Sequence, residues 1–294
     1  MTTQTTTVPQ TSVAAESPIP YGFKQTFNNW KFWTPLALLF MLLSMAMGAI
    51  SGIVSTDKTT TTPTGVEIQT MTPAQLAIMI PTFIIATIIG IIIGGLFYRN
   101  TLRQIDHDKN PTGTQPPSFN NWTKDIKWKN YILTSLLVSA IVLVAMTLIG
   151  GLIALAAVNG PAPVVVGLVI LFLLILIFAT PLISFAPLAA LDGYGPKESI
   201  STTFNAVKTR YWKVIGTLLL TYLIMFGIFT LAGLISLPFS FAHPMAGLIA
   251  STILSLIASV IVLPAVYLIM TKLYDEVVPR SIENPILQTE TTEQ

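Results

Sequence analysis

The sequence predicts an all-α integral membrane protein with six transmembrane helices. Of its 294 residues, 52% are hydrophobic and only 10% are charged, whereas soluble domains carry roughly 25% charged residues. Six apolar blocks have no charged residue in their interior. Each block is long enough for the ~20-residue helix that crosses the hydrocarbon core of a bilayer. A short pattern that precedes every second block divides the six spans into three hairpins.

The amino-terminal tail is predicted to be disordered and cytoplasmic. Residues 1–19 are rich in Thr, Gln, Ser and Pro and carry a single charge, Glu16, a composition that cannot bury a core. The first apolar run begins only near Thr34, so the tail does not resemble a signal peptide. We therefore expect the first span to act as an uncleaved insertion signal.

Three units of similar design follow this tail. Each consists of an amphipathic surface helix and a hairpin of two spans. The predicted units cover residues 20–103, 118–192 and 193–280, with a hydrophilic linker at 104–117 and a polar tail at 281–294. The six spans are expected at about residues 35–54, 74–98, 131–158, 164–191, 214–236 and 247–272.

The surface helices are predicted from apolar residues that recur at helical spacing. The third is the clearest, because Pro196 suits a first helical turn and the following apolar residues share one face. Its apolar face contains Ile200, Phe204, Val207 and Tyr211. The first helix has Phe23, Phe27 and Trp30 on one face, and the second has Ser118 as its expected cap, followed by Phe119, Trp122 and Ile126. Such helices lie in the membrane surface.

The three units are predicted to be an internal repeat. The dipeptide Phe-Asn occurs at Phe27, Phe119 and Phe204, at separations of 92 and 85 residues, and each copy is followed within nine residues by Trp and Lys. Chance is the competing explanation for these few shared letters. All copies would have the same orientation, unlike the inverted repeats of many transporters.

The distribution of basic residues predicts that both termini lie in the cytoplasm. Of the 15 Lys and Arg residues, 14 fall on one predicted side and only Lys58 falls on the other, and the side rich in Lys and Arg is cytoplasmic. All five tryptophans are on that same side and are expected to be interfacial anchors: Trp30, Trp33, Trp122, Trp128 and Trp212.

Three basic residues at the end of the third surface helix are candidates for lipid contacts. Lys208, Arg210 and Lys213 precede the fifth span, and each could attract an anionic headgroup by about 1 kcal/mol. Anchors that extend from the helix to the interface are the alternative explanation. These three are the only ligand contacts that the sequence predicts.

The sequence contains few candidates for catalytic or metal-binding residues. Charges are missing from the interior of the spans, which argues against a proton relay, and the absence of cysteine excludes thiolate chemistry. Asp106-His107-Asp108 could contain metal ligands, although a solvated loop is the expected interpretation; His243 is expected to be structural. Asp192 could pair with a lysine, cap the next helix or remain solvated. We predict no catalytic residue, cofactor or metal, and the net charge of +2 gives no basis for nucleic-acid binding.

The region between the fourth and fifth spans resembles a known bacterial pattern. In that pattern a span ends, a Gly-containing turn leads to an amphipathic helix, and an aromatic-basic group opens the next span. Here these features are Ala190-Leu191-Asp192-Gly193-Tyr194-Gly195, the helix with Phe204 and Val207, and Arg210-Tyr211-Trp212-Lys213 with Gly216. The ending is similar too: Leu263-Pro264-Ala265, Tyr267 and Lys272-Leu273-Tyr274.

These residues resemble the superfamily that contains the membrane domain of some glycerophosphodiester phosphodiesterases and many stand-alone membrane proteins of unknown function. The resemblance covers residues 161–276 best. It implies a membrane fold and not hydrolysis, because the sequence has no counterpart of the phosphodiesterase catalytic domain.

Two functional hypotheses follow. The first is a non-enzymatic protein of the bacterial cytoplasmic membrane that organises lipid or assists a membrane protein partner. The second is a permease-like protein for a neutral or lipidic solute, favoured by the prolines inside the spans: Pro81, Pro181, Pro187 and Pro264. An intramembrane enzyme ranks third, because no acid, base or nucleophile lies in the spans. The sequence predicts neither the partner nor the oligomeric state.

Overall fold

Helices make up nearly all of the described chain. A computed structural model describes residues 16–54, 59–61, 67–69, 73–157, 166–171 and 179–278. Its helices are α1 (Pro18–Asn28), α2 (Trp30–Val54), α3 (Pro73–Lys109), α4 (Trp128–Ala157), α6 (Thr180–Asp192), α7 (Pro196–Thr209), α8 (Tyr211–Ala242) and α9 (Pro244–Val277). Two short strands, β1 (Thr59–Thr61) and β2 (Glu67–Gln69), pair antiparallel with Thr60 opposite Ile68.

Four helices are long and apolar enough to cross a membrane. They cover Ile80–Lys109, Trp128–Leu152, Tyr211–Phe241 and Met245–Val277, which coincide with the second, third, fifth and sixth predicted spans. Two shorter apolar helices, Trp30–Ala46 and Thr180–Asp192, lie in the first and fourth. Much of the fourth predicted span falls outside the described residues, so the count of six stays a prediction.

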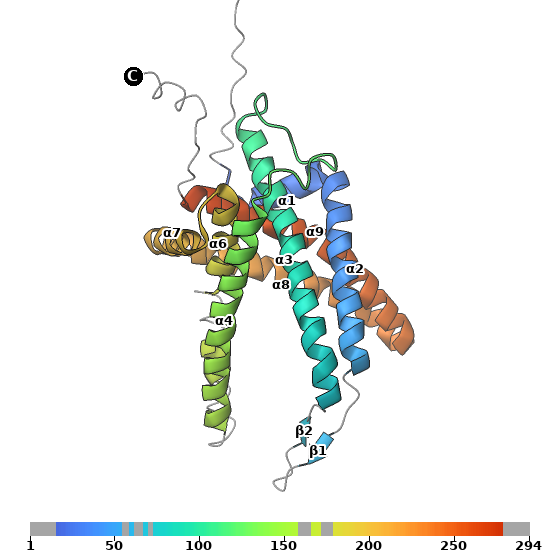
Figure 1. Cartoon of the computed structure of the whole chain (residues 1–294). Helices are drawn as coiled ribbons and strands as arrows, with labels where there is room; N and C mark the ends of the chain where they lie inside the picture. Colours follow the sequence, from blue (N-terminus) through green and yellow to red (C-terminus); the bar gives the residue numbers. More distant parts are fainter. Residues whose placement is uncertain are drawn as a thin grey trace, which may run out of the picture.

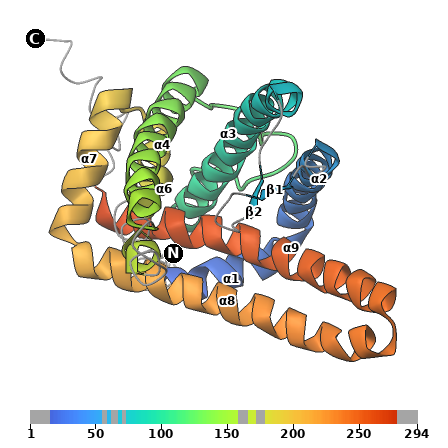
Figure 2. The same cartoon turned by 90° about the horizontal axis from the view of Figure 1, so that it is seen from below.

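The helices divide into a row and a slanted hairpin. The axes of α2, α3 and α4 are roughly parallel, and these three helices form the row. Helices α8 and α9 form the hairpin: they lie side by side and cross the row at a steep slant (Figures 1 and 2). In Figure 1 the short helix α7 lies across the view, whereas α4 runs down it. That placement agrees with the surface helix expected from its amphipathic sequence.

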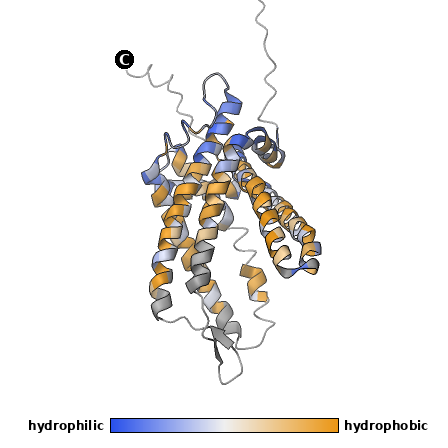
Figure 3. Cartoon of the chain, turned by 90° about the vertical axis from the view of Figure 1, so that its right-hand side faces the viewer, coloured by the Kyte–Doolittle hydropathy of each residue, from blue (hydrophilic) through white to orange (hydrophobic). Residues whose placement is uncertain are grey.

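Hydrophilic residues gather at one end of this arrangement, whereas most of the coloured length of the long helices is apolar, apart from a hydrophilic spot at the turn of the hairpin (Figure 3). We call this end the polar end: it comprises α1, residues 100–109 of α3, the loop 110–127, α7 and residues 271–278 of α9. The described chain both begins and ends there, at α1 and at the last turn of α9 (Figure 1). We call residues 136–152 of α4, 219–241 of α8 and 245–257 of α9 the apolar arms.

The buried core lies at and just below the polar end. One cluster includes Leu102, Phe185, Leu218 and Tyr274, and a second includes Tyr21, Trp33, Phe97, Ile105 and Leu268. The apolar arms instead expose large side chains such as Leu148, Phe226 and Ile253. Exposed apolar surface of this extent marks contact with lipid or with another protein.

Two glycines allow helices to approach closely within this core. A Cβ atom on Gly22 would lie 2.7 Å from the carbonyl oxygen of Ala265, so α1 can cross α9 only with glycine there. A Cβ atom on Gly95 would lie 2.7 Å from the ring of Tyr131, which joins α3 to α4. Small residues at such crossings are typical of helices packed in membranes.

The prediction of a second surface helix is wrong. Residues 119–125 form turns and α4 begins only at Trp128. Arg103 of α3 donates hydrogen bonds to the carbonyl oxygens of Asn121 and Lys124, and a helix through this segment would need those oxygens for itself. Ser118 caps no helix, because no helix begins directly after it; its amide donates a hydrogen bond to Asn121 Oδ1. Among the three expected surface helices, only the first and third correspond to helices of the structure, α1 and α7.

Candidate functional site

A cleft lies between the row and the hairpin in the apolar region. It has a volume of about 410 Å³ and lies between α2, α8 and α9. Its walls are built from Phe40, Met41, Ser44, Met45, Met225, Phe229, Ser259, Val262, Leu263 and Val266. The α8–α9 hairpin lies at a slant to α2 (Figures 1 and 2), and residues of all three helices line the cleft.

The cleft presents a hydrocarbon surface to any occupant. Its two polar residues are engaged within their own helices: the Ser44 hydroxyl donates to the Phe40 carbonyl at 3.0 Å, and that of Ser259 donates to the Ser255 carbonyl at 2.7 Å. The three methionines supply flexible, polarizable side chains that fill irregular spaces. This chemistry suits an aliphatic chain or an apolar helix.

The polar end is held together by a carboxylate at the end of α3. Asp108 accepts hydrogen bonds from Tyr21 Oη and Gln25 Nε2 of α1 and from Gln104 Nε2, each at 2.8 Å. Burial, with a smaller effect of the adjacent Asp108 carboxylate, raises the pKa of Tyr21 well above its usual range. Tyr21 therefore remains a neutral donor that fixes α1 on α3.

The last turns of α9 form a second polar contact region. Lys109 pairs with Asp275 at 2.6 Å, and Tyr274 donates to Asp192 Oδ2 at 2.8 Å. Lys272 is only 1% exposed and lies 3.8 Å from Glu276. Because a buried charge is costly without partners, these contacts give the carboxyl end of α9 a fixed position among α3, α6 and α8.

The three predicted lipid contacts have different surroundings. Lys213 pairs with Glu276 at 2.8 Å, and Arg210 donates to the Glu276 carbonyl oxygen. Both therefore join the start of α8 to the end of α9. Lys208, by contrast, lines a small apolar pocket between α6 and α7. It forms no ion pair within the part of the chain that the structure describes.

The five tryptophans predicted to be interfacial anchors differ in their exposure. Trp30 and Trp212 are exposed, and Trp122 and Trp128 are half-buried. Trp33 is 0% exposed and stacks on Phe97 at a ring-centroid distance of 6.3 Å. A fully enclosed indole cannot contact lipid, so Trp33 packs the core in place of the expected anchoring role.

His107, considered as a metal ligand, and His243, expected to be structural, both have contacts within the protein. His107 Nδ1 lies 2.7 Å from the Thr114 carbonyl oxygen, and His243 Nδ1 accepts a hydrogen bond from the Met245 amide at the start of α9. Among the described residues, no three His, Cys, Asp or Glu side chains are grouped so as to hold a metal ion. Asp192, for which three roles were open, accepts a hydrogen bond from Tyr274.

Sequence reasoning missed the cleft and the roles of Asp108 and Arg103. The cleft is built by helices far apart in the chain, so no local pattern indicates it. The polar residues in the last turns of α3 could have indicated these roles, because they come directly after the predicted second span. Four of them are buried: Asn100, Thr101, Arg103 and Gln104. Buried polar residues in such a position need partners from neighbouring elements.

Together these features define a class: a helical protein with several helices of membrane-spanning length, packed through a polar end. A family model described as a protein of unknown function (DUF4013) matches residues 78–241, more than half of the chain. The protein belongs to this family. The match runs from α3 to α8 and leaves out α2 and α9, which supply most of the cleft. No curated protein and no solved structure matches the chain.

Proposed function

We propose that the protein is a non-enzymatic integral membrane protein that organises lipid. The observation that carries this proposal is the cleft of about 410 Å³ between α2 and the α8–α9 hairpin. In a bilayer, a cleft with apolar walls is filled by acyl chains or by a partner helix, because water has no polar group to bind there. A cleft of this kind would hold lipids in a fixed arrangement beside the protein.

The proposal includes six spans with both termini in the cytoplasm of a bacterial cell. The grouping of charged residues at the polar end supports it, since 14 of 15 Lys and Arg residues lie on this predicted side and basic residues collect in the cytoplasm. The resemblance to the phosphodiesterase membrane-domain superfamily adds only the expectation of a membrane fold, because the family match carries no activity.

The non-enzymatic part of the proposal rests on what the polar side chains do. Asp108 accepts three hydrogen bonds that fix α1 on α3. Arg103 donates to the Lys124 carbonyl and pairs with Asp125. Residues with such roles set the positions of helices, and changing their protonation for catalysis would disturb that packing.

Native nanodiscs provide the test. The full chain would be extracted with its surrounding membrane, and mass spectrometry would identify every lipid and protein retained. We expect lipid bound to the purified chain, and we expect Ser259→Phe, which narrows the cleft, to retain less of it. Ile257→Phe is the matched control, because Ile257 lies on the same helix with 52% exposure and does not line the cleft.

The outcomes separate the hypotheses. Equal lipid retention in both variants would contradict the proposed role of the cleft. A stoichiometric protein partner lost only from Ser259→Phe would show that the cleft binds a helix of that partner instead. Only the second result would favour assistance of a partner complex over lipid organisation.

A permease-like role for a lipidic solute is the second candidate. One observation favours it: Pro264 lies inside α9 directly after Leu263 of the cleft wall, and a proline inside a helix removes a hydrogen bond and permits bending there. Vesicles containing the protein and a fluorescent phospholipid in one leaflet provide the test. Movement of the lipid that Ser259→Phe slows would support transport over organisation.

A further inference from the structure

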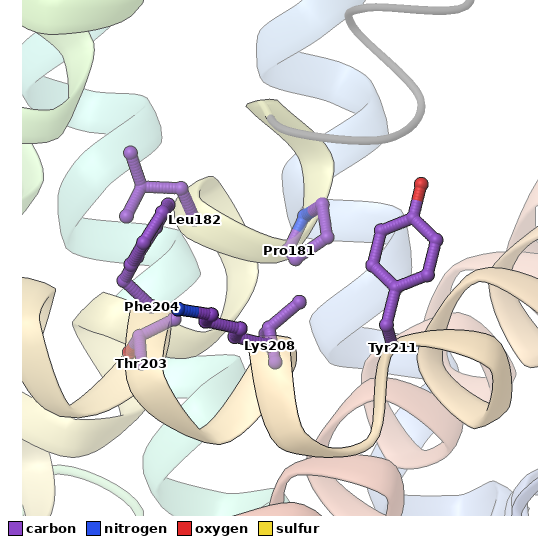
Figure 4. Close-up of a pocket in the computed structure, with 7 residues that line it drawn as sticks. Pro181, Leu182, Thr203, Phe204, Lys208 and Tyr211 are labelled. Atoms are coloured by element: carbon purple, nitrogen blue, oxygen red, sulfur yellow. The ribbon is translucent and has the colours of Figure 1, made fainter.

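A second pocket lies under the surface helix α7. It is bounded by Pro181 and Leu182 of α6, by Thr203, Phe204 and Lys208 of α7, and by Tyr211 at the start of α8. In Figure 4, Phe204 reaches toward Leu182 on one side of the pocket, and Tyr211 stands on the opposite side. The walls are apolar, and the charged Lys208 lies at the rim.

The residues around the pocket are of the kind found at a membrane interface. α7 belongs to the polar end and lies across the view in Figure 1, where α4 runs down it. The basic Arg210 and the exposed Trp212 come directly after α7. Aromatic and basic residues gather where headgroups meet the hydrocarbon core. A ligand here would meet apolar walls on one side and headgroup-level charge on the other.

Lys208 differs from the neighbouring basic residues in its contacts. Arg210 and Lys213 both contact Glu276, so their charges serve the junction of α8 with α9. Lys208 is exposed and has no carboxylate within ion-pair distance in the described part of the chain. An ammonium group beside apolar walls complements a molecule with an anionic head and an aliphatic chain.

Thr203 supplies an independent observation that points to a ligand. Its side chain is 1% exposed, lines the pocket, and its Oγ1 has no hydrogen-bond partner among the described residues. A buried threonine in a helix usually donates to a carbonyl oxygen one turn earlier. An unpaired buried hydroxyl therefore indicates a missing partner, which an ester or phosphate oxygen of a lipid would provide.

The size of the pocket limits the occupant. Its volume is about 120 Å³, close to that of the engineered apolar cavity of about 150 Å³ that binds benzene. This space admits the first few methylene groups of an acyl chain and excludes a whole lipid tail. The remainder of the chain would lie along the exposed surface of the neighbouring helices.

We propose that the α6–α7 pocket is a binding site for an anionic phospholipid. Lys208 contacts the phosphate, the Thr203 hydroxyl contacts an oxygen of the lipid, and Phe204 and Leu182 hold the start of one acyl chain. This inference deepens the proposed lipid-organising function and rests on it. It adds a preference for headgroup charge that the uncharged cleft cannot provide.

The test counts lipids bound to the full chain by native mass spectrometry. The protein would be placed in nanodiscs with equal amounts of phosphatidylglycerol and phosphatidylcholine that have identical acyl chains. We expect the wild type to retain an excess of phosphatidylglycerol. Lys208→Gln should lower that excess about fivefold, the effect of one lysine near an anionic surface. Thr203→Val, which keeps the side-chain shape, should also lower it.

Lys197→Gln is the matched control. Lys197 is exposed on the same helix and does not line the pocket, so its variant should retain the wild-type ratio of the two lipids. An unchanged ratio in Lys208→Gln or in Thr203→Val overturns the proposal, and so does an equal decrease in Lys197→Gln. Excess inorganic phosphate should leave the ratio unchanged, and a loss of the preference would identify a site for free anions instead.

The proposals about the pocket and about the cleft can be contradicted independently of each other. A wild-type protein that retains lipid without a headgroup preference overturns the inference about the pocket and leaves the proposed function standing. A headgroup preference that depends on Lys208, combined with no effect of Ser259→Phe, overturns the proposed role of the cleft and supports the pocket.

Discussion

The polar end and the apolar arms follow opposite packing rules. At the polar end, segments far apart in the chain meet through buried side chains: Thr101 of α3 and Thr271 of α9 have their hydroxyl oxygens 2.7 Å apart. Along the apolar arms, large side chains such as Leu148 and Phe226 are 65% and 71% exposed. The same helices therefore change from protein contact to outward-facing surface along their length.

The difference has a physical cause. Lipid tails are as apolar as leucine, so burying a leucine between helices in a membrane gains little over leaving it in lipid. Hydrogen bonds and aromatic packing at the polar end do not have an equivalent partner in lipid. We infer that the stability of the fold is concentrated at the polar end, and that the arms remain free to diverge and form the cleft.

The largest expected effect comes from Trp33→Ala. Trp33 is fully buried in the core just below the polar end. The centroid of its ring lies 4.9 Å from that of Phe32 and 6.3 Å from that of Phe97. Its loss should lower the free energy of unfolding by about 3–5 kcal/mol, as for buried aromatic residues generally. The measurement is unfolding by SDS titration in micelles, followed by near-ultraviolet circular dichroism.

Trp33→Phe is the control for this variant. It keeps a ring in the cavity and removes the indole N–H, which has no hydrogen-bond partner among the described residues. It should therefore lose much less stability than Trp33→Ala. If Trp33→Ala unfolds like the wild type, the core does not lie at the polar end and the comparison fails.

Sequence reasoning located four long helices and α7, but not the contacts between helices. Apolar blocks free of charge correctly placed α3, α4, α8 and α9, because a membrane span must be both long and uncharged. The short helix α7 was also predictable, since its apolar residues recur every three or four positions. The positions of these helices were predictable because each is determined by residues close together in the sequence.

Features that depend on distant segments were not predictable. Phe119 and Trp122 have the spacing of a helix face, yet Arg103 from α3 takes the carbonyl oxygens of that segment and holds it in turns. Trp33 has the same interfacial position in the sequence as Trp212, and only packing against Phe97 distinguishes the two. The cleft was also invisible, because it requires the slant between α2 and the α8–α9 hairpin.

An intermediate effect is expected from Tyr21→Phe, which removes the hydrogen bond from Tyr21 Oη to Asp108 Oδ2 at 2.8 Å. A bond to a charged group contributes about 1.5–3 kcal/mol, so the variant should lose that amount at neutral pH. The same SDS titration provides the measurement.

The pH dependence of this pair makes the test sharper. Burial and Asp108 raise the pKa of Tyr21 in the folded protein, while the unfolded chain releases this proton near its ordinary value of about 10. Above about pH 10 the unfolded state therefore binds fewer protons than the folded state, and wild-type stability falls as pH rises. Tyr21→Phe lacks this contribution, so the gap between the two proteins should shrink. A constant gap would mean that Tyr21 is not protected by burial.

The smallest effect is expected from Trp212→Ala. Trp212 is 83% exposed where α7 meets α8, so its removal should change the free energy of unfolding by less than about 0.5 kcal/mol. In vesicles, brominated lipids should quench the fluorescence of Trp212 but not that of Trp33, which can be compared in proteins that retain one tryptophan each. A loss as large as that of Trp33→Ala would mean that another surface buries this indole in the membrane. The two tryptophans would then be equivalent, and stability would extend beyond the polar end to a contact outside the chain.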